Sequence, residues 1–137
     1  MNEVVEQMNA HRPAFLNELN GAVDSIDTDH EILRMRFDID NRFCHSGNVV
    51  QGGFVTSMLD STMTHAAFVF GGEVVNVATM EIKVSFLEPA LEGKFICEGK
   101  MVKVGGSTGF MSGELFNPEG KLIATSTTTA RLVRPKK

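Results

Sequence analysis

The sequence predicts an α+β fold in which one long apolar helix is enclosed by a curved, mostly antiparallel sheet. Residues 54–70 are apolar on nearly all sides of a helix, and glycine pairs at Gly52-Gly53 and Gly71-Gly72 bound them. The C-terminal half consists of strand-like runs separated by turns, and residues 32–39 alternate between apolar and polar side chains. A helix that is apolar all round has to be buried, and a curved sheet is the element available to cover it.

The remaining elements follow from local patterns. Residues 1–20 are typical of an amphipathic helix, which Pro13 could kink or divide. We expect one domain over 1–137 with its core at about 22–133. The core elements expected around the central helix are strands within 22–39, a loop at 40–50, and strands at 74–87, 94–104, 108–116 and 122–133.

Composition excludes several functional classes. The 137 residues are 42% hydrophobic and 22% charged, as in ordinary globular proteins, and the net charge of -4 gives no basic surface for nucleic acid. The acidic N-terminus lacks the apolar segment of a signal peptide, and the stretch at 54–70 contains Asp60 and His65, which argues against a membrane span. We therefore expect a cytoplasmic protein that binds neither nucleic acid nor a membrane.

The cysteines, histidines and serines do not suggest a familiar reactive centre. Cys44 and Cys97 show no disulfide framework or CxxC motif, which favours two free thiols. The four histidines and two cysteines lack the spacing of metal ligands. Ser57 and Ser61 lie outside any G-x-S-x-G elbow, so a serine hydrolase is rejected. We expect no metal, and His65 is interpreted as a core or interface histidine.

Asp60 is the residue that we expect to carry chemistry. It is the only Asp, Glu, Lys or Arg between Cys44 and Gly72. A lone carboxylate in an apolar helix is costly unless something compensates it. Asp60 could cap a neighbouring loop, but we favour a general base or nucleophile.

The Gly52-Gly53 pair is the second candidate feature. Amides at a helix N-terminus are unpaired and partly positive, and glycine lets a ligand approach the backbone, so the pair could hold a developing oxyanion. It could also be a plain turn into the helix. Gly52 and Asp60 are about 12 Å apart along one helix, too far for one small reacting group. We therefore expect antiparallel helices from two copies to share each site, in a dimer or a dimer of dimers.

These motifs resemble a known family. The helix motif, Gln51-Gly52-Gly53-Phe54 followed by Met58-Leu59-Asp60-Ser61 and Ala66-Ala67, resembles that of hot-dog-fold thioesterases in the 4-hydroxybenzoyl-CoA thioesterase-like superfamily. The nearest branch is that of phenylacetic acid degradation, which includes the thioesterase-superfamily-member-2 kind. The segment 79–90 is similar to the strand that follows the helix in that branch. The family usually has His where this chain has Gln51, and it often has Asn where this chain has His45.

The resemblance implies hydrolysis of an acyl-CoA thioester to a free acid and CoA by a homo-oligomer without a cofactor, since CoA belongs to the substrate. It implies that Asp60 is the base or nucleophile and that the Gly52 amide binds the thioester oxygen. Thr79 would orient the attacking water, although it could be only a strand former. Gln51 would donate to the carbonyl or merely face solvent, and His45 would contact the thioester or order its loop.

A set of polar and basic residues is the candidate for binding the rest of the substrate. CoA is polyanionic, so an acidic protein needs a local basic patch to hold it. The turn at 105–108 follows Lys103 and could meet phosphates, although a glycine-bearing hairpin turn is the plainer interpretation. The substrate-binding candidates are Gly53, Lys103, Gly106, Ser107, Arg131 and Arg134.

Two other functions remain open at this stage. Gln51 in place of histidine fits a non-catalytic acyl-CoA-binding protein with the same fold, whereas the retained Asp60 argues for an enzyme. An enoyl-CoA hydratase would need an Asp/His pair in a loop before the helix. Asp40 and His45 are present there, but their spacing does not fit.

Overall fold

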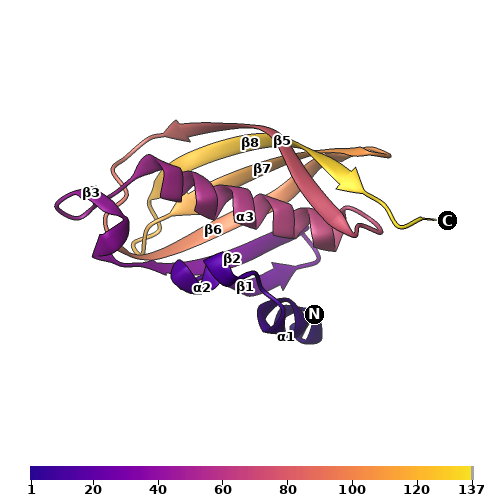
Figure 1. Ribbon diagram of the computed structural model, residues 1–137, viewed down its shortest axis with the longest axis horizontal. Helices are drawn as coiled ribbons and strands as arrows, with labels where there is room; N and C mark the ends of the chain where they lie inside the picture. The colour runs from indigo at the N-terminus through magenta and orange to yellow at the C-terminus, as the bar shows by residue number, and fades with distance from the viewer. Residues whose placement is uncertain (137) are drawn as a thin grey trace.

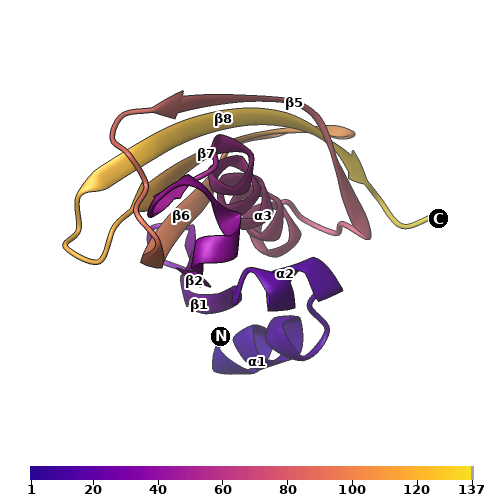
Figure 2. The ribbon, with the colours of Figure 1, turned by 60° about the vertical axis from the view of Figure 1, so that its left-hand side comes forward.

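The computed structural model describes residues 1–136, and Lys137 of the C-terminal tail lies outside the described residues. A six-stranded antiparallel sheet, in the order β1-β2-β6-β7-β8-β5, curves around helix α3 (Gly52–Phe70) (Figures 1 and 2). This arrangement confirms the predicted α+β hot-dog architecture. The strands of this sheet are β1 (Ala22–Asp27), β2 (Ile32–Ile39), β5 (Asn76–Phe86), β6 (Gly93–Val104), β7 (Thr108–Phe116) and β8 (Leu122–Val133).

The N-terminal helix expected over 1–20 is divided in two, which is one of the two outcomes expected at Pro13. Helix α1 spans Asn2–Ala10 and helix α2 spans Ala14–Glu18. Pro13 separates them, with an extended backbone at φ -65° and ψ 152°, and it is the N-cap of α2. Proline disfavours the helical conformation of the residue before it, which explains why one helix cannot run through this point.

The loop predicted at 40–50 contains short elements that lead into α3. A 3-10 turn, η1 (Asn41–Phe43), is followed by the two-stranded pair of β3 (Cys44–Ser46) and β4 (Val49–Val50). The Asp40 side chain accepts a hydrogen bond from the Arg42 N–H and so caps η1. The segment between β2 and α3 is therefore held by a side-chain cap and a short strand pair.

The core lies between α3 and the concave face of the sheet. Met58, Leu59 and Met63 of α3 are fully buried. Gly99 brings the sheet close to the helix, since a Cβ there would lie 2.7 Å from the carbonyl oxygen of Thr62. Close approach of this kind lets one helix fill the interior of a strongly curved sheet.

Helix α3 is not enclosed on all sides in the single chain, which corrects the expectation of a fully buried helix. One stripe of α3 is exposed or half-buried, and Phe68 at its C-terminal end is 40% exposed. The stripe consists of Gly53, Ser57, Asp60, Thr64 and Phe68. Asp60 therefore lies at a half-open surface of the single chain.

In the described part of the chain, one edge strand of the sheet is covered by a helix, and the other is not. At the β1 edge, α1 lies beside the strand (Figure 2), and the Asn9 side chain pairs with both the N–H and the C=O of Val23, at 2.8 and 3.0 Å. The opposite edge strand, β5, has no strand on its outer side within residues 1–136 and exposes Met80 and Phe86. A long edge strand that nothing covers is a template for pairing with another strand.

No helix in the part of the chain that the structure describes is long and apolar enough to cross a membrane.

Candidate active site

Asp60 lies midway along α3 and is joined to the edge strand of the sheet. The Thr79 hydroxyl on β5 donates a hydrogen bond to Asp60 Oδ1 at 2.7 Å. No other hydrogen bond to the Asp60 carboxylate is formed within residues 1–136, so Oδ2 can serve a water or a substrate. The structure thus brings together two of the predicted site residues.

A β-bulge in β5 gives Thr79 its orientation. The register with β8 shifts between Thr79, which pairs with Ala130, and Glu81, which pairs with Thr129. Met80 is the extra residue, and it is exposed. Bulges commonly re-aim side chains next to functional sites.

The first turn of α3 leaves one amide without a partner. The Gln51 N–H donates to the Phe43 carbonyl at 2.9 Å, the Gly53 N–H donates to Gln51 Oε1 at 2.7 Å, and the Phe54 N–H donates to the Gln51 carbonyl at 2.9 Å. Within residues 1–136 no acceptor is found for the Gly52 N–H. Gly52 is therefore the amide available to an external oxygen.

The other two residues at this helix entry have more limited roles. The amide of Gly53 is used within the cap, so the predicted contact of Gly53 with substrate cannot come from its N–H. Gln51 is exposed, and its side-chain oxygen is occupied as the helix cap. Its NH2 group stays available as a donor, which keeps the predicted carbonyl contact of Gln51 open.

Gly52 lies in the wall of an apolar groove of about 400 Å³. The ring of Phe86, at the end of β5, packs over Gly52, where a Cβ would lie 3.3 Å from Phe86 Cζ. His45 is at the same groove, with its Nδ1 2.7 Å from the Ser46 hydroxyl. The other lining residues are Val49, Val50, Val55, Leu87, Glu88, Pro89, Ala90 and Ile123. Asp60 is not among them.

The single chain therefore carries two separate halves of a site. One half is Asp60 with Thr79, and the other is the Gly52 amide with its apolar groove. The helical rise places the two about 12 Å apart along α3.

The predicted phosphate contacts gather at the far end of α3, around the turn between β6 and β7. Arg134 donates from Nε to the Gly106 carbonyl, from Nη2 to the Gly105 carbonyl and from Nη1 to the Glu73 carbonyl, each at 2.9 Å. Nη1 also donates to the Gly71 carbonyl. These contacts use Arg134 to tie the tail, the turn and the end of α3 together, which argues against its predicted role in binding phosphate. Gly106 takes part only through its carbonyl, so a phosphate contact through the Gly106 N–H stays a prediction.

The remaining candidates of this set differ in availability. The Ser107 carbonyl accepts from the Leu132 N–H at 2.8 Å, whereas no hydrogen bond occupies its hydroxyl within residues 1–136. Lys103 and Arg131 are exposed on β6 and β8. In the described residues their side chains form no ion pair, so they stay available to an anion.

The thiols and His65 do not compete with Asp60 as reactive groups. Burial raises the pKa of the Cys97 thiol to about 12. Burial, then the charges of Glu92 and Asp40, raises the pKa of Cys44. Both thiols stay protonated and poorly nucleophilic. His65 is held by the Ser61 carbonyl, 2.6 Å from its Nδ1, in keeping with the predicted core histidine. Among the described residues, no group of three or more His, Cys, Asp or Glu side chains could hold a metal.

Sequence reasoning missed three features of this region. The close contact of the Phe86 ring with Gly52 at the helix entry is one of them. The bulge at Met80 has no local sequence signal, because it is defined by the register with β8. The contacts of Phe43 with Gln51 and Phe54 were also missed, as was the ion pair between Arg42 and Glu18, because they depend on how the loop folds back on the chain.

A long helix held in a curved antiparallel sheet defines the hot-dog fold. The chain belongs to the thioesterase superfamily, whose family model matches residues 47–124. This confirms the family predicted from the helix motif.

Two proteins of Saccharolobus solfataricus, both provisionally named esterases, are similar in sequence. One is 32% identical over 94 residues, which cover 69% of this chain and 66% of that protein. The other is 29% identical over 72 residues, which cover 53% of this chain and 47% of that protein. The matches thus span about two thirds and about half of the length of these relatives.

Solved structures place the chain beside the phenylacetic acid degradation branch. A phenylacetic acid degradation-related protein of Ralstonia eutropha JMP134, provisionally assigned as a thioesterase, is 25% identical with a TM-score of 0.83, covering 93% of this chain and 98% of that one. A thioesterase family protein of Silicibacter pomeroyi is 25% identical with a TM-score of 0.83, covering 98% of both chains. The PaaI protein from the phenylacetic acid degradation operon of E. coli shares the fold at 17% identity, with a TM-score of 0.80 and coverage of 93% and 92%.

Proposed function

We propose that the protein hydrolyses an acyl-CoA thioester to a free carboxylic acid and CoA. The observation that carries the proposal is the unpaired N–H of Gly52 at the start of α3, since Gly52 also lines an apolar groove of about 400 Å³. A thioester oxygen would accept a hydrogen bond from this amide while the apolar acyl group occupies the groove. Membership of the thioesterase superfamily supports this assignment.

The complete site is proposed to form between two copies of the chain. Strand β5 is an uncovered edge, whereas the β1 edge is capped by Asn9. Two copies that pair through β5 about a twofold axis run antiparallel, and the exposed stripe of α3 in one copy then faces α3 of the other. Asp60 of one copy would meet Gly52 of the second, which removes the separation of about 12 Å within one helix. A dimer of dimers would contain the same pair of sites.

In the proposed reaction, the Gly52 N–H stabilises the oxygen of the tetrahedral intermediate. A water held by Asp60 Oδ2 attacks the thioester carbon and transfers a proton to the carboxylate, while the Thr79 hydroxyl holds Oδ1. The C–S bond then breaks, and Asp60 returns the proton to the CoA thiolate. Direct attack by Asp60 to form an anhydride, which water then hydrolyses, is the alternative route. Every group in both routes comes from the chain, water or the substrate.

The CoA portion is proposed to extend toward Lys103 and Arg131. Lys103 and Arg131 are exposed on the strands next to the turn at 105–108, which Arg134 ties to the end of α3. The last residue of α3 lies about 15 Å beyond Asp60 along the helix. In an antiparallel pair that end projects past the Gly52 groove of the other copy. An extended pantetheine arm could therefore carry the phosphates to the exposed cations.

A thiol-release assay with purified protein and a panel of acyl-CoAs tests the function. The panel should contain short and medium aliphatic acyl groups together with an arylacetyl group. We expect turnover that is saturable in acyl-CoA. Binding of acyl-CoA, measured by calorimetry, without thiol release would instead support the non-catalytic alternative, and neither binding nor release would contradict both.

A further inference from the structure

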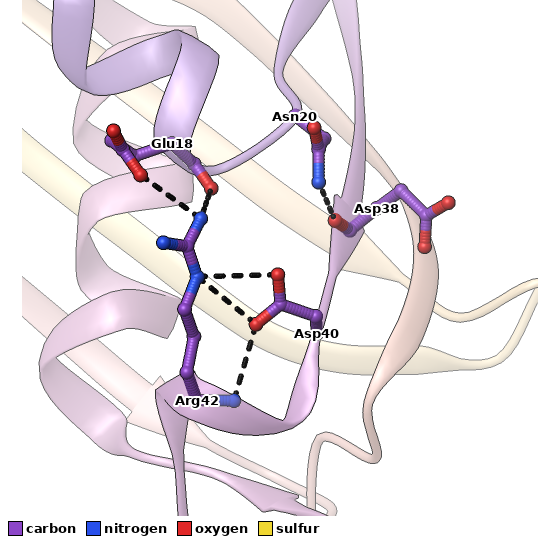
Figure 3. Close-up of polar contacts among 5 residues, drawn as sticks. All are labelled: Glu18, Asn20, Asp38, Asp40 and Arg42. Atoms are coloured by element: carbon purple, nitrogen blue, oxygen red, sulfur yellow. Dashed lines mark hydrogen bonds and ion pairs between the residues drawn. The ribbon is translucent and has the colours of Figure 1, made fainter.

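An ion-pair cluster links the end of α2 to the turn before α3 (Figure 3). Arg42 Nη2 lies 2.9 Å from Glu18 Oε2 and donates to the Glu18 carbonyl at 3.0 Å. Arg42 Nε lies 3.2 Å from both carboxylate oxygens of Asp40. The guanidinium is thus anchored on two sides, by a helix end and by the cap of η1.

The same guanidinium packs against Phe43. Its central carbon lies 4.8 Å from the centre of the Phe43 ring, a cation–π contact. The Phe43 ring also meets the Phe54 ring edge-on, with centroids 4.7 Å apart and planes at 65°. The Phe43 carbonyl accepts the Gln51 N–H at 2.9 Å.

Phe43 therefore holds the chain on both sides of the glycine pair. Gln51 directly precedes Gly52, and Phe54 directly follows Gly53. The Gly52 N–H shares a planar peptide group with the Gln51 carbonyl, so its direction depends on what fixes Gln51. Arg42 is the side chain that fixes Phe43 from the outer side.

We propose that Arg42 is a positioning residue for the Gly52 amide and acts through Phe43. The inference rests on the proposed role of Gly52 in holding the thioester oxygen. Exposed ion pairs add little to stability. The ion pairs of Arg42 instead help to fix the direction of the Gly52 N–H. A small misplacement of a catalytic group can lower the reaction rate strongly.

Steady-state kinetics of Arg42→Ala test the proposal. We expect kcat to fall about 10-fold or more, with KM within about twofold of wild type, because a shift of about 1 Å can cost about 100-fold in rate. Arg42→Lys keeps a cation near the Phe43 ring but loses the fork to Glu18 and Asp40, so its kcat should be intermediate. The Gly52 amide resonance in ¹⁵N-labelled protein should move in Arg42→Ala.

Arg12→Ala is the matched control. Arg12 also binds near α2, donating to Asn17 Oδ1 at 2.7 Å and to the Gly21 carbonyl at 3.2 Å, without touching η1. It should leave kcat and the Gly52 resonance unchanged. A folded Arg42→Ala with kcat within twofold of wild type, or an equal loss in Arg12→Ala, would overturn the positioning role.

Two further outcomes separate this inference from the proposed function. An inactive wild-type protein contradicts the function, whereas an active wild type with an unaffected Arg42→Ala contradicts only the inference. If Arg42→Ala does not fold, Glu18→Gln weakens the same anchor more gently. It should lower kcat without raising KM, and an unchanged kcat would again overturn the role of Arg42.

Discussion

Thr79 and Phe86 lie on the same face of β5, toward α3, although their positions in the sequence differ by an odd number, seven. In a regular strand such a pair would point to opposite faces. The extra residue at Met80 restores the match, so Thr79 reaches Asp60 while Phe86 covers Gly52. One bulge thus places both halves of the candidate site along a single strand.

Thr79→Val should lower kcat by about 10-fold or more while leaving the fold intact. Valine keeps the branched shape that suits a strand but cannot donate to Asp60 Oδ1, so the carboxylate loses its orientation. Thr79→Ser retains the hydroxyl and should keep most of the activity. Equal activity in the valine and serine variants would show that this hydrogen bond has no catalytic role.

Phe86→Ala should change which acyl groups are preferred. Removing the ring that packs over Gly52 widens the groove, so kcat/KM should rise for bulky or long acyl groups relative to short ones. Each buried methylene is worth about 0.8 kcal/mol, roughly a fourfold preference. Phe110→Ala, which removes an exposed ring from β7 outside the groove, is the control. An unchanged order of preference in Phe86→Ala would place the acyl group elsewhere.

Arg134→Ala should destabilise the protein by about 1–3 kcal/mol, since it removes charge-assisted hydrogen bonds to the backbone carbonyls of Gly71, Glu73, Gly105 and Gly106. Urea unfolding of the variant, with Lys136→Ala in the same tail as control, measures the difference. The KM for acyl-CoA at low salt should change little in the folded enzyme. A raised KM with unchanged stability would restore the phosphate-binding role predicted from the sequence.

His65 should make the protein less stable in mild acid. Burial lowers the pKa of His65 below the usual 6.5, and the hydrogen bond with the Ser61 carbonyl only partly offsets this effect. The unfolded chain therefore binds the proton more readily, so the contribution of neutral His65 is complete above about pH 6.5 and is lost as the pH falls through its lowered pKa. The free energy of unfolding should fall more steeply between about pH 7 and pH 5 in wild type than in His65→Gln. His11→Gln, at an exposed position, should follow wild type; identical slopes in all three proteins would contradict the account.

Much of the fold could be predicted because its boundaries are local. Glycine pairs mark both ends of α3, and β7 and β8 begin and end where the turns predict. The approximate positions of the functional side chains followed from the helix motif and the family resemblance. The environment of these side chains could not be predicted in the same way. The half-open surface at Asp60 depends on how far the sheet wraps around the helix.

Features that depend on distant partners escaped prediction. The bulge at Met80 exists only relative to β8, and the acceptors of Arg134 are carbonyls from two remote loops. A basic residue near a glycine-rich turn indicates an anion site as readily as it indicates a structural tie. Only the hydrogen bonds that the basic side chain donates in the structure distinguish an anion site from a structural tie.

The central claim is that each active site combines Asp60 of one copy with Gly52 of another. Asp60→Asn removes the base and should lower kcat by roughly 100- to 10,000-fold. Asp38→Asn, which changes an exposed carboxylate on β2, is the control and should leave kcat unchanged. Gly52→Val should also inactivate the enzyme, because its side chain would lie between the amide and the Phe86 ring.

Complementation between these two inactive variants tests the shared site most directly. The Asp60→Asn and Gly52→Val proteins are unfolded, mixed in equal amounts and refolded, and formation of mixed dimers is verified with differently tagged chains. Each mixed dimer would contain one doubly damaged site and one intact site, so activity should return to about a quarter of the wild-type value per total site. No recovery in verified mixed dimers, or full activity in an isolated monomer, would show that each chain carries its own complete site.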